Sequence, residues 1–271
     1  MASLPNPLPQ IAADPTGTTL GLRLPPGGLV DTTADGPSDQ PLLWIADSPA
    51  GPRSWAGVLP ARRHGLLPVL LADRAGGSGV RTLGHLRPRM MSHPGNHDAE
   101  EVLAGFWEAY AAEEADEDTP PAWHGLATPA LTPACDPDAD AEELSEYVTG
   151  ADGVAWLPHA RIALVPARRS ADIPAAIGWT GPLNHENDVA RLCAVMRSWE
   201  DRFGVRLVAL GFDTMLLSVA APPTTRTAAE QLAAEHYAFC PDTIDQSGPA
   251  TTPETYAVEL LTARTWSFWW D

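Results

Sequence analysis

The chain has 271 residues, 44% of them hydrophobic, and a formal net charge of −18. This length and composition allow one large domain or two smaller ones with a sizeable core. Its longest apolar runs fall far short of the roughly 20 residues that a membrane span needs, so we expect no membrane protein. The negative charge disfavours a nucleic-acid-binding protein, because contacts with phosphate need cations.

The first residues show no basic region followed by an apolar stretch, which predicts a chain without a signal peptide. Cys135, Cys193 and Cys240 form neither a disulfide framework nor a C-x-x-C pair. Both features predict a cytoplasmic location. All 17 basic residues are arginine, which together with the many Ala, Pro and Gly residues indicates a GC-rich bacterial genome.

Residues 1–40 are rich in Pro, Gly, Asp and Thr and predict a loop-rich N-terminal arm. We expect residues 41–118 to form an N-terminal α+β module. Its expected elements are strands at 42–45 and 66–71, a short helix or irregular segment at 55–64, and an amphipathic helix at 99–115. Pro68 favours an edge position or a strand start for the second strand, because proline has no N–H to donate.

Residues 119–153 predict an acidic, proline-rich linker with a helical turn at 141–147. The stretch between Met90 and Ala160 holds 16 acids and no basic residue, whereas the rest of the chain holds 17 arginines and 19 acids. Such a stretch is either a solvated segment that maintains solubility or a surface that attracts a basic protein partner.

Residues 154–271 predict a second α+β domain. Its expected elements are strands at 162–166, 205–210 and 214–220, and helices at 172–177, 187–203, 227–239 and from residue 253 or 254 onward. The order of elements predicts an α+β fold in two modules, with a mixed or antiparallel sheet and helices packed on it.

The last six residues, Trp266 to Asp271, contain four aromatic side chains and are expected to dock into the fold or into a partner. We expect them on the last helix, with one face against the sheet and the other face buried or exposed as an interaction hot spot. A carboxylate at the end of a helix is unfavourable, so we expect Arg202 or Arg264 to pair with Asp271.

Three stretches resemble the bacterial domain-of-unknown-function family 4253. They are Trp199-Glu-Asp-Arg-Phe-Gly204 with the strands at 207–220, Glu235–Asp242 with Asp245 and Gln246, and Trp266-Ser-Phe-Trp-Trp-Asp271. Trp179 and Asn184 also resemble positions of this family. The resemblance covers about residues 154–271, and the part from Trp44 to Leu71 is, more loosely, similar to the region that often precedes this domain. It implies a cytoplasmic protein of actinobacterial type and no particular reaction, and it suggests the immunity and interaction proteins.

His236 and Cys240 are four residues apart on a predicted helix, so their side chains share a face. A Cys–His pair can provide a nucleophile, with Asp242 or Glu235 orienting the imidazole. The alternatives are a polar binding pocket and simple packing, since a small apolar residue packs well at a helix end.

Two polar loops carry the remaining binding candidates. Asn184, His185, Glu186 and Asp188 lie in the first, and Asp242, Asp245 and Gln246 lie in the second. Helix capping accounts for such residues, but loops that meet beside Trp179 would line a polar cleft with an aromatic wall. The candidate binding residues are Trp179, Asn184, Glu200, Arg202, Asp245, Gln246, Trp266, Trp269 and Trp270.

His93, His97 and Asp98 are weak candidates for a metal site, with His85 as a third imidazole. Pro94 and Gly95 make a helix improbable there, so a turn-rich loop is the simpler interpretation. Phosphate-loop, dinucleotide, serine-hydrolase and zinc-protease motifs are absent from the sequence, and we expect no cofactor.

The sequence favours a non-enzymatic, protein-binding and immunity-like module whose acidic region docks a basic protein. The alternative is a small-molecule-binding protein or an enzyme with a polar cleft around Cys240, His236 and Asp242.

Overall fold

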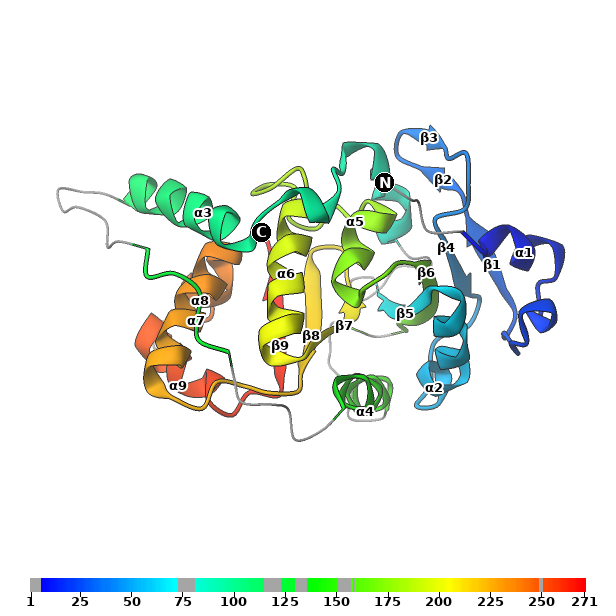
Figure 1. The fold of residues 1–271 in the computed structure, drawn as a ribbon. Coiled ribbons are helices and arrows are strands. Elements are labelled where there is room, and N and C mark those ends of the chain that lie inside the picture. Colours follow the sequence, from blue (N-terminus) through cyan, green and yellow to red (C-terminus); the bar gives the residue numbers. More distant parts are fainter. Residues whose placement is uncertain are drawn as a thin grey trace.

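The computed structural model describes residues 6–72, 81–114, 123–129, 136–150, 157, 159–248 and 251–271. These residues form a seven-stranded mixed sheet with helices on both faces and a small two-stranded sheet (Figure 1). The predicted α+β class is confirmed. In the described part of the chain, no helix has the length and apolar character that crossing a membrane requires.

The strands of the large sheet follow the order β1-β4-β6-β5-β7-β8-β9, and every neighbouring pair except β5 and β7 is antiparallel. Their bounds are β1 Gly27–Val30, β4 Leu43–Ala46, β5 Leu66–Leu71, β6 Arg161–Pro166, β7 Val205–Leu210, β8 Thr214–Val219 and β9 Thr265–Trp269. The small sheet pairs β2 (Thr32–Thr33) with β3 (Gly36–Pro37).

The described α-helices are α1 Leu8–Ala13, α2 Ser54–Val58, α3 Ala99–Glu114, α4 Pro137–Thr149, α5 Ile173–Ile177, α6 Ala190–Phe203, α7 Arg226–Phe239, α8 Asp242–Asp245 and α9 Pro253–Leu260. The described 3-10 turns are η1 Thr18–Leu20, η2 Leu59–His64, η3 Arg81–His85, η4 Pro88–Met90, η5 Pro94–Asn96 and η6 Ser170–Asp172.

The large sheet joins strands from both predicted modules. β6, from the second module, lies between β4 and β5 of the first. The stretch predicted as a linker contains α4, which packs against β7 and β8. The predicted boundaries at residues 118 and 153 therefore do not separate two sheets.

Alternating side chains of the strands enter two cores, one on each face of the sheet. Leu43 and Ile45 of β4 point to the face covered by α3, α5, α6, α7 and α9. Trp44 and Ala46 point to the face covered by α1, α2 and α4. The two helices of the acidic stretch, α3 and α4, thus lie on opposite faces of the sheet.

Helix α6 begins three residues later than predicted. The carboxylate of Asp188 accepts a hydrogen bond from the amide of Ala190, the first residue of the helix, so Asp188 itself stays in the preceding loop. The helix stops where predicted, since Gly204 adopts the left-handed conformation with φ 63°.

The edge position predicted for β5 is wrong, because β6 and β7 flank it. The amide of Ala72 donates to the carbonyl oxygen of Leu210, the last residue of β7, and the carbonyl oxygen of Gly65 accepts the amide of Ala167, after β6. Backbone groups of successive residues in a strand point to opposite neighbours. In β5 the even-numbered residues therefore face β7 and the odd-numbered residues face β6. Pro68 thus lacks an N–H on the β7 side. The two strands pair only beyond it, at Leu70 and Leu71.

The C-terminal aromatic residues lie in and next to the edge strand β9. The prediction that they lie on the last helix is wrong. Residues Trp266 and Phe268 are buried, whereas Thr265 and Ser267 are exposed. This alternation has the period of a strand, and aromatic residues favour strands. The buried rings of β9, which pairs with β8, pack against α6 and α7.

Candidate functional site

Three side chains contact the last residues of the chain and a fourth contacts one of the three; we call Asn184, His185, Cys240 and Asp242 the C-terminal clasp. Asn184 Nδ2 donates to the carbonyl oxygen of Asp271 at 2.8 Å, and Asp242 Oδ2 accepts the amide of Asp271 at 3.1 Å. Cys240 Sγ lies 2.9 Å from the carbonyl oxygen of Trp269. His185 Nε2 is 3.3 Å from Asp242 Oδ2. The two predicted polar loops therefore meet, and the chain's own end lies between them.

Trp179 forms the aromatic wall beside the clasp. Its indole N–H donates to the carbonyl oxygen of Gly211 at 2.8 Å, and its ring meets that of Trp270 edge-on at 5.5 Å. Gly178, with φ 71°, lies so close to Pro88 that an added Cβ would be 2.1 Å from its nitrogen. Only glycine fits this approach, which fixes the position of Trp179.

Asp245 and Gln246 lie exposed at the end of α8. Gln246 Nε2 donates to Asp242 Oδ1 at 2.8 Å, so it supports the clasp from outside.

His236 and Cys240 are both buried, and the structure gives each a packing role. His236 Nδ1 is 2.8 Å from the hydroxyl of Tyr256, and its ring lies 4.5 Å from that of Trp266. Burial raises the pKa of Cys240 to about 12, so the residue stays a thiol at neutral pH. Because the thiolate is the nucleophile, this geometry gives no support to a catalytic Cys–His pair.

The buried His236 predicts a dependence of stability on pH. Burial, with a smaller effect of the charge of Arg202, lowers the pKa of His236 to about 3, against about 6.5 in an unfolded chain. Between these values only the unfolded state binds the proton. Stability therefore rises with pH across this window and is lost as the pH falls towards 3. We expect this group to contribute a slope of about 1.4 kcal/mol per pH unit.

Urea unfolding at pH values of about 4, 5.5 and 7 measures this slope. The variant His236→Phe should flatten it, whereas a change of the exposed His124 to Gln should leave it unchanged. An equal slope in His236→Phe and the parent protein would contradict the assignment.

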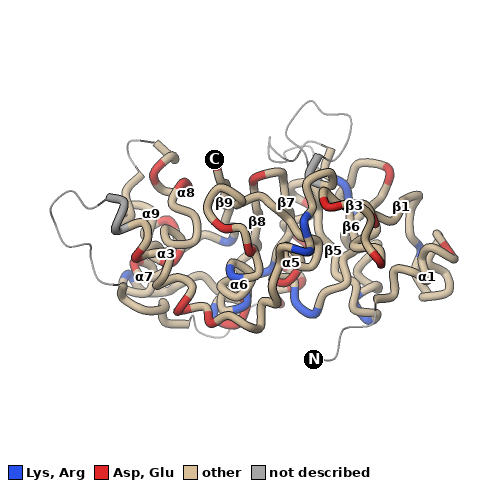
Figure 2. The backbone as a smooth tube through the Cα atoms, turned by 90° about the horizontal axis from the view of Figure 1, so that it is seen from above, with Lys and Arg blue, Asp and Glu red and all other residues tan. Residues whose placement is uncertain are grey.

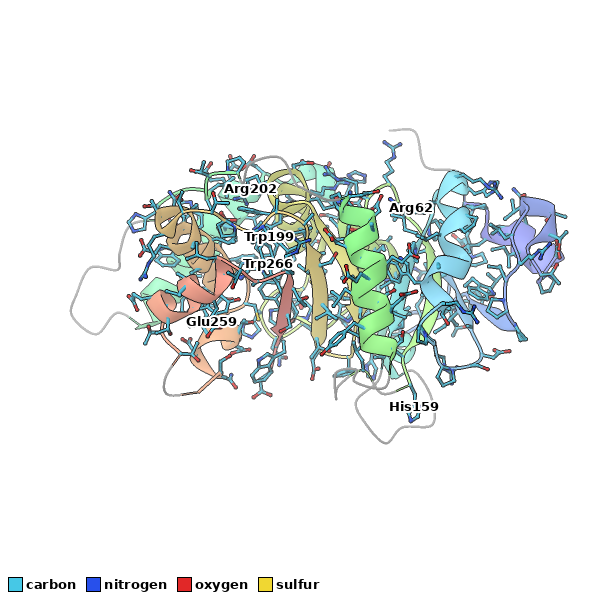
Figure 3. The ribbon with its side chains drawn as sticks, turned by 90° about the horizontal axis from the view of Figure 1, so that it is seen from below. Arg62, His159, Trp199, Arg202, Glu259 and Trp266 are labelled. Carbon is cyan, nitrogen blue, oxygen red and sulfur yellow. The ribbon has the colours of Figure 1, made fainter. Side chains whose placement is uncertain are left out.

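Glu200 and Arg202, both predicted binding residues on α6, engage in separate networks. Arg202 donates to both carboxylate oxygens of the fully buried Glu235, at 2.7 and 2.6 Å. The same carboxylate accepts the indole N–H of Trp199 and the amide of Ala127. Figure 3 shows Trp199, Arg202 and Trp266 close together. Glu200 instead binds Arg169 at 2.6 Å.

The prediction that Arg202 or Arg264 pairs with Asp271 is wrong for both arginines. Arg202 pairs with Glu235, and Arg264 pairs with Asp140 at 2.9 Å. The reason is the strand at the C-terminus, because it removes the helix end at which a carboxylate would need compensation.

Two side chains of the predicted metal loop serve as caps, and the histidines beside them make other contacts. His93 Nδ1 accepts the amide of Gly95, and Asp98 Oδ1 accepts the first amides of α3. His97 Nε2 lies 2.6 Å from the hydroxyl of Ser92, and the ring of His85 packs edge-on against Phe212. Within the described ranges, no group of three His, Cys, Asp or Glu side chains is arranged to hold a metal ion.

A charged cavity of about 220 Å³ lies between α4 and α6, where β5 and β7 diverge, and the sequence analysis did not single it out. Its walls include Trp55, Arg62, Asp138, Arg169, Glu200 and Arg206. We call it the arginine cavity. Only Glu200 among these residues was a predicted binding residue.

Residues 161–271 match the family model described as "Domain of unknown function (DUF4253)". We call this matched segment the DUF4253 domain. No curated protein and no solved structure matched the chain. The DUF4253 domain holds β6 to β9, the C-terminal clasp and the ion pair between Arg202 and Glu235, whereas β4, β5, α3 and α4 precede it.

Among the two acidic helices that precede the DUF4253 domain, arginines pair with two of the five acids of α4 and with none of the exposed acids described on α3. On α4, Asp138 pairs with Arg62 and Arg206, and Asp140 pairs with Arg264. On α3, the exposed Glu100, Glu101 and Glu108 form no ion pair with any described residue. Figure 2 shows acidic positions around α3, α7 and α8 at one end of the molecule. Cys135 lies outside the described residues.

Proposed function

We propose that the protein is a non-enzymatic binding protein that takes up a basic protein partner on the outward face of α3. The observation that carries this proposal is the uncompensated charge of that helix. Residues Glu100 to Asp118 include eight acids and no arginine, and three of these carboxylates are exposed on the described part of α3. Such a surface attracts basic proteins and accelerates their association. An immunity-like protein that neutralises a basic toxin is one concrete form of this function.

The non-enzymatic part of the proposal rests on the groups around the clasp. Cys240 and His236 are buried, and Asp242 binds the end of the chain. A small-molecule site or an active site at these residues would require the last residues to leave. The geometry therefore favours the protein-binding function over this alternative.

Two variants with equal charge changes test the proposal. One replaces Glu100, Glu101 and Glu108 of α3 with glutamine, and the other replaces Glu142, Glu143 and Glu146 of α4. In affinity capture from a bacterial lysate at low salt, we expect the parent and the α4 variant to retain the same basic protein. The α3 variant should lose it, and high salt should release it from the parent and from the α4 variant.

For a captured partner, the association rate of the α3 variant should be about tenfold or more below that of the parent at low salt. Equal retention by the α3 variant and the parent would contradict the proposal. Equal losses by the two variants would show that net charge alone, and no surface on α3, governs the binding.

A further inference from the structure

We propose that the arginine cavity binds a small organic anion, whose carboxylate or phosphate group is held by Arg62 and Arg206. No described residue of α3 lines this site, which goes beyond the proposed function. Its elements come from the part of the chain before the DUF4253 domain and from the domain itself.

The cavity exists because β5 and β7 separate. Pro68 offers no N–H to β7, and the strands pair only from Leu70 onward. Ser170 of η6 occupies part of the gap, where its hydroxyl accepts the amide of Leu207 at 3.1 Å and donates to Glu200 at 2.6 Å. The remaining space is bordered by η2 and α4 and forms the cavity. Figure 3 shows Arg62 beside α4.

One wall carries a net positive charge. Arg62 Nη1 lies 2.6 Å from Asp138 Oδ2, and Arg206 Nε lies 2.7 Å from Asp138 Oδ1, so two guanidinium groups share one carboxylate. Burial opposes the ionisation of Asp138, but the hydrogen bonds from both arginines outweigh it and lower its pKa. Asp138 stays ionised at neutral pH and holds the two guanidinium groups side by side.

These arginines keep hydrogen-bond donors for a ligand. A guanidinium group has five N–H donors in a planar fork that matches carboxylate and phosphate oxygens. Besides Asp138, the described acceptor of Arg206 is the carbonyl oxygen of Val205. Arg62 donates to Asp138 through Nη1. The side chains are 37% and 24% exposed, so an oxyanion reaches them from the cavity.

The opposite wall directs the anion to the Arg62 side. There Arg169 is held by both Glu200 and Asp201, and Ser170 also donates to Glu200. These three groups together carry a net negative charge, which repels an anion, and the exposed Arg168 also lines the cavity. The sides between the two walls include apolar groups of Trp55 and Leu67. A cavity of about 220 Å³ with these features suits an anionic head group on a short apolar body.

The experiment uses the full-length protein and four probes: benzoate, phenyl phosphate, inorganic phosphate and benzamidine. Each is titrated while the indole N–H resonance of Trp55 and the Nε–H resonances of the arginines are followed by NMR. We expect benzoate or phenyl phosphate to shift the Trp55 and Arg206 signals. Benzamidine, which has the same ring and the opposite charge, should leave them in place. A stronger response to benzoate assigns the head group as a carboxylate, and a response to the two phosphates assigns it as a phosphate.

The variant Arg206→Met should weaken binding about tenfold or more, because a charge-assisted hydrogen bond is lost. The matched control is Arg226→Met, which removes an exposed arginine that pairs with Glu230 on α7. If Arg206→Met does not fold, Arg62→Met takes its place. The proposal is overturned if no anion shifts the Trp55 signal, if benzamidine shifts it equally, or if Arg226→Met weakens binding as much as the cavity variants.

Discussion

The variant Glu235→Ala should lower the free energy of unfolding by about 3–5 kcal/mol. Removal of this carboxylate leaves the guanidinium group of Arg202, which is 9% exposed, without its partner in a buried place. The indole N–H of Trp199 and the amide of Ala127 lose their acceptor as well. Urea denaturation measures the loss.

Glu230 on the same helix is the control, because its ion pair with Arg226 is about half exposed on both sides. We expect Glu230→Ala to cost less than about 0.5 kcal/mol. A double variant, Glu235→Leu with Arg202→Met, should be more stable than Glu235→Ala, because it removes both buried charges together. Equal losses for Glu235→Ala and Glu230→Ala would refute the importance of the buried network.

Removal of residues Trp266 to Asp271 should prevent the protein from folding. The deletion takes away most of β9 and the buried rings of Trp266, Phe268 and Trp270. Truncation of one such ring to alanine costs about 3–5 kcal/mol, and three of them approach the whole stability of a typical domain, about 5–15 kcal/mol. We expect poorly dispersed NMR spectra and no cooperative thermal transition.

Removal of Asp271 alone serves as the control. It deletes the two hydrogen bonds with Asn184 and Asp242 and leaves the buried rings in place. We expect a loss of about 1–3 kcal/mol with a retained cooperative transition. If the six-residue deletion unfolds at the same temperature as the parent, the strand is dispensable and the packing argument fails.

Most elements followed from the sequence, because their apolar residues repeat with the period of a strand or a helix. Residues 66–71 form the predicted strand, and α6 ends at Gly204 as predicted. The sequence failed where neighbours decide the structure. Four aromatic residues within six positions fit the period of a helix as well as that of a strand. Only the pairing with β8 places Trp266 and Phe268 in a strand. Likewise, the place of Pro68 within the sheet depends on β7, far away in the chain.

The predicted binding residues were brought together only in part. Trp179, Asn184, Trp269 and Trp270 do gather, but they surround the end of the chain. The arginine cavity was missed because its charged residues come from separate segments, from Arg62 to Arg206, and no local pattern links them. A single arginine in the sequence does not indicate which distant charged residue it will meet. The shared carboxylate of Asp138 becomes visible only in three dimensions.

The insertion of β6 between β4 and β5 has a consequence for folding during synthesis. When β4 and β5 have left the ribosome, the strand that belongs between them is still to be made, since Ala163 pairs with both Ile45 and Val69. The nascent chain then exposes two unpaired strand edges, which are prone to aggregation. Such non-local pairing also slows folding, because a long loop must close first. We therefore expect refolding of the full chain to depend strongly on protein concentration and to improve when a chaperone is present.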